Sequence, residues 1–367
     1  MTLKICPVLL PWRSLNRFFN TEGPHPALLL IFLSTLSSCY VTRQALHHNQ
    51  LYNSRRHIAH LLSDPKTPEK TKKRLKRLIH ILDYAKKQGL DTSHSYRYYI
   101  HLEGDVISYL VSAAKADRLE SKTWWFPFAG TVPYLGFFDE SERRQESEKL
   151  RTDGYDVYET ESAAFSGLGW FEDPVFSPML KGGRTRLASI IFHELVHKTL
   201  WVQDHAEFNE NLASYLEEHL TKKYLEELGL KKQLKRFMDK KQDLELYKIW
   251  LSDLKKALTG LYDQPPPGGR QTLLAKKKEL FRSFTTEKRP EFKWADYVGD
   301  EPWNNARVLA SSLYSPDTSR FLKAHQCSGM PDAGQFLERL SQALRQNDEP
   351  FEALDSLCQD SDLTKRG

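Results

Sequence analysis

The feature that most constrains this chain is the segment FHELVH, which lies inside a long apolar stretch. Residues 186–202 contain neither Gly nor Pro and can therefore form one uninterrupted helix. His193 and His197 are four residues apart, so both imidazole rings leave the same helical face, one turn above the other. Glu194 lies about 100° around the helix from His193. On so apolar a helix, three polar side chains would be costly to bury without a partner.

Two neutral imidazoles at this spacing can bind one zinc ion, and Glu194 could lean over a zinc-bound water. The motif alone does not establish a metal site, because roughly 3 in 100 chains of this composition would contain an HExxH by chance. The alternative is a helix whose histidines are satisfied inside an ordinary core. The residues that follow the helix have to distinguish the two.

A third metal ligand can come from the chain just after this helix. Asp204 is typical of a helix cap, with Glu207 three residues later, so we expect the chain to turn near residues 203–204. His197 precedes that turn by six or seven residues, and Glu210 follows it by the same number. In an antiparallel helical hairpin Glu210 would therefore face the two histidines.

The N-terminal segment is typical of an export signal. Ala27–Ser38 is a twelve-residue run without a charge, short for a membrane span but suitable for a signal peptide. It ends in LSSC, which resembles the bacterial lipoprotein box, in which the signal is cut before a lipidated cysteine. We expect residues 1–38 to be removed and Cys39 to carry the lipid; the alternative is an ordinary signal peptide or short anchor with an incidental cysteine. Because Tyr40 rather than Asp follows, we expect an outer-membrane anchor facing the periplasm.

HELVH followed by NENLA resembles the HExxH…NExxA arrangement of gluzincins, zinc peptidases whose third ligand is a glutamate. The thirteen-residue step from His197 to Glu210 is shorter than in thermolysin-like enzymes. More specifically, the chain resembles a family of bacterial lipoproteins described as predicted aminopeptidases. This resemblance covers essentially the whole mature chain and rests on the Cys39 box and on the segments TWWFPFAGTVPYLGFFDE, FSGLGWFEDP, IIFHELVH to FNENLASYLE, and NNARVL.

The resemblance implies a catalytic zinc site with one zinc ion per chain. The ligands would be His193, His197 and Glu210, which leave a fourth position for water, as a catalytic site requires. Glu194 would be the general base that takes the proton of that water during attack on a peptide carbonyl.

Thermolysin-like enzymes carry an acid four residues after the ligand Glu, where this chain has Ser214. Glu217, two helical turns after Glu210, lies on the same face and could orient a ligand histidine instead; equally, it could be an ordinary exposed glutamate. The candidate donor to the oxyanion of the intermediate is Tyr314, with Tyr134 and Tyr158 as competitors.

Residues that bind substrate are indicated less sharply. Ser162–Leu168, just before the active-site helix, is a candidate edge strand for the substrate backbone, although a simple turn is an equal alternative. Carboxylates suited to the ammonium group of an aminopeptidase substrate are Glu161, Glu172 and Asp173, and nothing in the sequence selects one. An aminopeptidase and a small-peptide endopeptidase are therefore not distinguished.

The expected fold is α+β and zincin-like, with a small sheet packed on the active-site helix. A chain of 367 residues, of which 40% are hydrophobic, is long enough for one large domain or two small ones, and we interpret the mature chain 39–367 as one. Its expected parts are a helical arm (40–122), a sheet region (123–183), the active-site helices (184–222) and a helical C-terminal part (223–367).

Charge and cysteine content limit the partners. The formal net charge is only +5 and no long block of one sign occurs, so there is no electrostatic case for nucleic acid. No Cys-x-x-Cys occurs, which disfavours a thiolate zinc cluster. Cys327 and Cys358 could form a disulfide in an oxidising compartment, or remain two buried thiols. The expected partners are a peptide substrate and the membrane, and the oligomeric state is not indicated.

We therefore expect a zinc-dependent peptidase of the bacterial envelope, most consistent with an aminopeptidase. The alternative is an envelope lipoprotein whose zinc site is not catalytic and which acts as an interaction or scaffold module. The charged helical hairpin expected over residues 222–287 keeps that alternative open.

Overall fold

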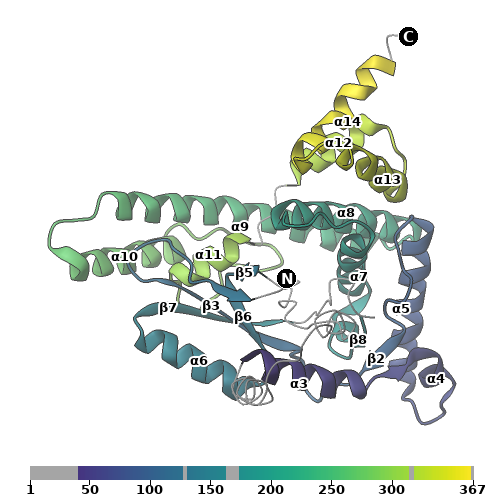
Figure 1. Cartoon of the computed structure of the whole chain (residues 1–367), viewed down its shortest axis with the longest axis horizontal. Helices are drawn as coiled ribbons and strands as arrows, with labels where there is room; N and C mark the ends of the chain where they lie inside the picture. Colours follow the sequence, from purple (N-terminus) through teal and green to yellow (C-terminus); the bar gives the residue numbers. More distant parts are fainter. Residues whose placement is uncertain (1–39, 127–129, 163–172, 314–317, 365–367) are drawn as a thin grey trace, which may run out of the picture. The chain divides into compact units, whose positions relative to one another are not determined.

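A computed structural model of the chain describes residues 40–126, 130–162, 173–313 and 318–364 (Figure 1). The fold is mixed α+β, mostly helical with small sheets, so the expected α+β class is confirmed. The chain divides into two compact units. Unit 1 comprises residues 1–60, 96–178 and 303–310; unit 2 comprises residues 61–95, 179–302 and 311–367. The zincin-like arrangement stays a prediction.

Unit 1 is built on a three-stranded antiparallel sheet of order β6-β3-β7. The central strand β3 (Ser108–Lys115) pairs with β6 (Tyr134–Phe137) and β7 (Tyr155–Ser162). Helix α6 (Glu140–Thr152) connects β6 to β7 and is capped by Asp139, whose side chain accepts two backbone N–H bonds. The core under it consists of Val111, Ala113, Leu135, Phe137, Leu150 and Val157.

Unit 1 contains further strands and helices besides this sheet. Strand β2 (Tyr98–Ile100) pairs antiparallel with β1 (Arg56–His57) and parallel with β8 (Val175–Phe176), and β4 (Trp124–Phe126) pairs antiparallel with β5 (Gly130–Val132). Two helices, α4 (Ile58–Ser63) and α11 (Asn305–Leu313), begin in one unit and end in the other. Helix α3 (Tyr40–Asn53) also belongs to unit 1.

The helical arm expected over 40–122 is wrong in its second half, because β2 and β3 lie within it. Nearly all of β3 is buried, since it is the central strand and both of its faces are covered. Such a strand shows no alternation of polar and apolar residues, and its pattern in the sequence is therefore ambiguous. The central strand of the sheet, β3, therefore lies before the sheet region expected over residues 123–183.

Unit 2 is helical. Its described elements are α5 (Glu69–Lys87), the short 3-10 helix η1 (Met179–Gly182), α7 (Gly183–Thr199), α8 (Ala206–Glu227), α9 (Lys231–Asp263), α10 (Gly269–Thr286), α12 (Ser319–Ser328), α13 (Ala333–Leu344) and α14 (Pro350–Thr364). Helices α5 and α8 both pack against α7, and α9 packs against α8 and α10. The long helix expected from residue 222 is interrupted, because Gly229 has φ +65° and separates α8 from α9.

Two glycine backbones meet where α5 ends and α13 begins. A Cβ atom at Gly334 would lie 2.7 Å from the Cα of Gly89, far inside the normal contact distance. Gly89 also has φ +83°, a left-handed conformation that side chains with a Cβ rarely adopt. The close approach of these two segments therefore depends on glycine on both sides.

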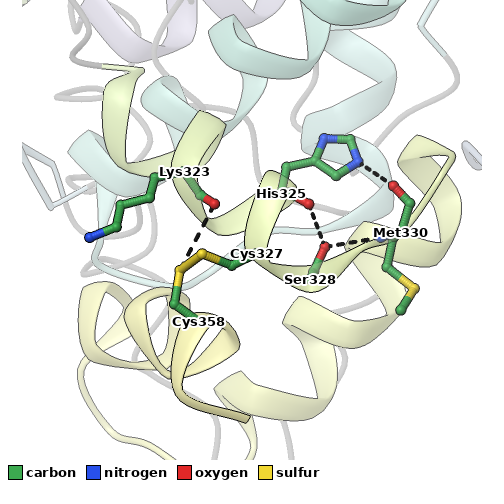
Figure 2. The surroundings of a disulfide bond; sticks show 6 residues. All are labelled: Lys323, His325, Cys327, Ser328, Met330 and Cys358. Carbon is green, nitrogen blue, oxygen red and sulfur yellow. Dashed lines mark hydrogen bonds between the residues drawn. A yellow bond between two sulfur atoms is a disulfide. The ribbon is translucent and has the colours of Figure 1, made fainter. Parts of the chain in front are cut away.

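The C-terminal helices are joined by a disulfide between Cys327 on α12 and Cys358 on α14 (Figure 2). On the same helix α12, the buried His325 donates from Nε2 to the carbonyl of Met330 at 3.1 Å. Its Nδ1 therefore carries no proton and accepts a 2.7 Å hydrogen bond from the hydroxyl of Tyr215 on α8. Burial lowers the pKa of His325 to about 4, which keeps the ring neutral.

Among the described residues, no helix is long and apolar enough to cross a membrane. The expected signal peptide and Cys39 lie outside the described residues, so the lipid anchor stays a prediction.

Candidate metal centre

Helix α7 carries the FHELVH segment, begins at Gly183 and ends at Thr199, three residues before the end of the stretch 186–202 that lacks Gly and Pro. It is buried almost all round from Leu187 to His197, including both histidines and Glu194. A helix that is apolar on every side is stable only inside a core, where its polar groups need partners. Three ionisable side chains of one helix, His193, Glu194 and His197, are therefore buried from water.

The turn that follows brings α8 back against α7. Asp204 is not the cap of α8, contrary to expectation; it has φ +62° and forms the turn itself, and His205 occupies the cap position without a side-chain cap bond. The turn is held by Asn209, whose side chain accepts from the N–H of Val202 at 2.9 Å and donates to its carbonyl at 2.7 Å. These two hydrogen bonds tie the first turn of α8 to the end of the preceding loop, directly before Glu210.

Three side chains converge inside this helical hairpin. The Nε2 atoms of His193 and His197 are 3.1 Å apart. Glu210 lies 3.5 Å from the first nitrogen through Oε2 and 3.8 Å from the second through Oε1. These three residues are the group of potential metal ligands found among the described residues.

The arrangement fits a zinc ion. Tetrahedral zinc with bonds of about 2.0–2.2 Å brings its ligand atoms to about 3.3–3.6 Å from one another. The three observed separations, 3.1, 3.5 and 3.8 Å, bracket that range. Two imidazoles and one carboxylate are also the donor set of catalytic rather than structural zinc sites. The side chain of Glu210 is 23% exposed, so solvent can reach this side of the group.

Two further observations favour a bound cation. Glu194 is buried, and its Oε2 has no hydrogen-bond partner among the described residues. Burial lowers the pKa of His193, but Glu210, Glu217 and Glu194 outweigh burial and raise it to about 9. The negative charge of these three carboxylates would equally favour a bound cation, which would displace the proton from His193.

A second carboxylate supports the histidine nearest the helix start. Glu217 Oε2 lies 3.6 Å from Nδ1 of His193, on the opposite side of the ring from Glu210. Its other oxygen lies 4.0 Å from Nζ of Lys241 on α9, and that ammonium is also 3.5 Å from Glu218. Burial raises the pKa of Glu217, but Lys241, His193 and Ser189 together lower it to about 2, so the carboxyl is ionised.

The other sequence candidates fall into two groups. Tyr314, Glu172 and residues 163–168 lie outside the described residues. The rest belong to unit 1, whereas the three ligand candidates belong to unit 2. Those unit 1 residues are Tyr134 on β6, Tyr158, Glu161 and Ser162 on β7, and Asp173 before β8.

Two residues that support the candidate metal centre, Asn209 and Lys241, are not predicted from the sequence. Asn209 was visible as the first residue of NENLA, and an asparagine in the first turn of a helix is a signal for a side-chain bond to a neighbouring backbone. Lys241 carried no signal, because it lies one helix later in a segment rich in lysine.

A family model described as "Putative aminopeptidase" matches residues 39–352. The chain belongs to this family. No curated protein and no solved structure matches the chain significantly. The match spans both units and includes every candidate ligand. It confirms the expected resemblance to a family described as aminopeptidases.

Proposed function

We propose that this chain is a zinc-dependent peptidase that acts as an aminopeptidase. The observation that carries the proposal is the convergence of His193, His197 and Glu210 beside a buried carboxylate, Glu194, that has an unbonded oxygen. The description of the family supports a peptidase, and the donor set supports zinc.

Zinc held by these residues would supply a Lewis acid that lowers the pKa of a water molecule toward neutrality. Glu194 takes the proton of the attacking water and returns it to the leaving amine. Glu217 Oε2 lies 3.6 Å from Nδ1 of His193, and its negative charge favours a proton on that nitrogen, which leaves Nε2 of the ring as the metal-binding atom. Lys241 keeps Glu217 ionised for that purpose.

The location is part of the proposal. A lipid on Cys39 would hold the chain at the outer membrane, facing the periplasm, where peptides are the accessible substrate. Changing Cys39→Ser should move the protein from the membrane fraction to the soluble fraction and remove the mass of the lipid from the mature chain. A protein that stays in the membrane fraction with an unchanged mass would contradict the anchor.

The catalytic proposal is tested with Glu194→Gln. We expect the wild-type protein to contain one zinc ion per chain and to release N-terminal residues from a peptide library. The variant should keep its zinc and lose about 10²–10⁴-fold in kcat. Glu207→Gln, which changes an exposed glutamate on α8, is the matched control and should leave both values unchanged.

Three results would contradict parts of the proposal. Activity that survives Glu194→Gln would remove the general base. Protein without zinc, together with a harmless His193→Ala change, would remove the metal centre. Internal cleavage instead of release of single N-terminal residues would make the enzyme an endopeptidase.

A further inference from the structure

An exposed indole lies against one of the candidate metal ligands in unit 2. The ring centroid of Trp201 is 5.5 Å from that of His197, and the two ring planes meet at 69°, which is an edge-to-face contact. His197 is buried, whereas Trp201 is 43% exposed. Among the large hydrophobic side chains that the described residues expose, Trp201 is the one in ring contact with a candidate ligand.

The backbone is held by hydrogen bonds on both sides of Trp201. Leu200, the first residue after helix α7, is extended, and its N–H donates to the carbonyl of Val196 at 2.9 Å. Val202 is held by its two hydrogen bonds to the side chain of Asn209. An indole also has only two side-chain torsions, so little conformational entropy is lost when a ligand packs against it. Trp201 is therefore a pre-organised apolar surface.

A single exposed hydrophobic side chain needs no explanation by itself. Trp294, which is exposed to the same extent at 44%, is such a case, and its Nε1 donates to Asp239 on α9. Trp201 differs because it contacts His197. Glu210, the third candidate ligand, is 23% exposed. Both the ligand group and the indole beside it are therefore accessible from solvent.

The proposed reaction determines which part of a peptide lies nearest to the metal centre. In an aminopeptidase, the attacked carbonyl belongs to the first residue of the substrate. The Cα atom of that residue is bonded to the carbonyl carbon, about 1.5 Å away, so its side chain starts two bonds from the reacting atom. The side chain of the first residue is therefore the one best placed to contact a ring that packs on a metal ligand.

We propose that Trp201 forms one wall of the subsite that receives the side chain of the first substrate residue. Because the indole offers apolar surface, this subsite favours a large apolar residue such as leucine over a small one such as alanine. The inference rests on the proposed function, since it places the substrate at the metal centre. It adds a substrate class that neither the HExxH motif nor the description of the family gives.

Amino acid hydroxamates test this subsite without catalysis. Leucine hydroxamate and alanine hydroxamate carry the same zinc-binding group and differ only in the side chain. Their dissociation constants are measured by calorimetry on the full chain loaded with zinc. The proteins compared are wild type, Trp201→Ala, Trp201→Phe and Trp294→Ala, in which the control tryptophan is equally exposed.

We expect wild type to bind leucine hydroxamate about 10-fold more tightly than alanine hydroxamate, because three further carbon atoms are removed from water. Trp201→Ala should reduce this ratio to within about threefold of unity. Trp201→Phe should keep most of the preference, because it keeps an aromatic ring, and Trp294→Ala should keep all of it. Equal binding of the two hydroxamates by wild type, or an unchanged ratio in Trp201→Ala, would overturn the proposal.

Hydrolysis of leucine and alanine 4-nitroanilides by the same proteins distinguishes a subsite from a structural role. Trp201→Ala should lower kcat/KM about 10-fold for the leucine substrate only, with one zinc ion still bound per chain. An equal loss for both substrates, or a loss of zinc, would mean that Trp201 only positions His197 and would overturn the subsite.

The two measurements also separate this inference from the proposed function. The expected hydroxamate ratio in a protein that releases no nitroaniline would contradict the peptidase activity and support the subsite. An active enzyme that binds both hydroxamates equally would support the activity and refute the subsite. A zinc-loaded chain that binds neither hydroxamate would refute both.

Discussion

Glu217→Gln tests how this chain holds its metal centre. The change keeps the size of the side chain and removes its charge. Glu217 bridges His193 Nδ1 at 3.6 Å and Lys241 Nζ at 4.0 Å. At 4.0 Å, two unit charges attract by about 4 kcal/mol with an effective dielectric constant of about 20. Part of this is offset by desolvation of both groups, and Lys241 keeps a second partner, Glu218, at 3.5 Å.

We therefore expect zinc affinity to fall about 10–100-fold in Glu217→Gln, which corresponds to about 1.4–2.7 kcal/mol. Affinity is measured by competition with a chromophoric chelator. The measurement is made above the pKa of His193, about 9, because below it a proton competes for the ring. Without that precaution, loss of Glu217 would also ease proton release from His193 and hide part of the effect.

Two companion variants separate positioning from a general loss of structure. Lys241→Met should weaken zinc binding only while Glu217 is present, so the double variant should bind zinc as Glu217→Gln alone does. Glu218→Gln changes the other carboxylate near Lys241 and should leave zinc affinity unchanged. Zinc binding by Glu217→Gln within twofold of wild type, or an equal loss of affinity in Glu218→Gln, would contradict this role of Glu217.

Three further predictions concern unit 2. Because burial lowers the pKa of His325 to about 4, from 6.5, the unfolded chain takes up the proton first as the pH falls. The free energy of unfolding should therefore decrease by up to about 3 kcal/mol between those two values, and a urea series that shows the same decrease in His325→Gln would contradict this. Gly334→Ala should lower the free energy of unfolding by about 1–3 kcal/mol, because its Cβ would meet the backbone of Gly89. Gly260→Ala, whose Cβ meets no atom within 4 Å, should raise it by about 0.5–1 kcal/mol. Shifts of the urea midpoint in the same direction in both variants would refute the backbone contact. Changing both Cys327 and Cys358 to Ser should lower the free energy of unfolding by about 2–4 kcal/mol, and an unchanged melting curve would show that the bond is absent in solution.

Elements with a local signal could be predicted from the sequence. The apolar stripe of residues 69–87 and the glycine at Gly89 predict a helix with these bounds, and α5 has them. Aspartate is a preferred cap residue, and Asp139 caps helix α6 directly before Glu140. Strand β3 could not be recognised, because it is buried on both faces and its residues therefore show no alternation of polar and apolar side chains.

The candidate site divides in the same way. His193, His197 and Glu210 are brought together by one turn, so their spacing along the chain was informative. Asp204 was assigned the wrong role, because a cap and a turn residue with positive φ draw on the same residue types. Lys241 reaches the site from another helix, and only tertiary packing reveals such a residue.

The bonds of Asn209 to Val202 have a consequence for how the protein folds. The candidate ligands span only eighteen consecutive residues, from His193 to Glu210, and a bond across seven residues closes their turn. Closing so short a loop costs little chain entropy, and contacts this local form early. The metal centre can therefore assemble as a helical hairpin before the more distant Lys241 arrives, which makes ligand convergence an early event in folding and ligand orientation a late one.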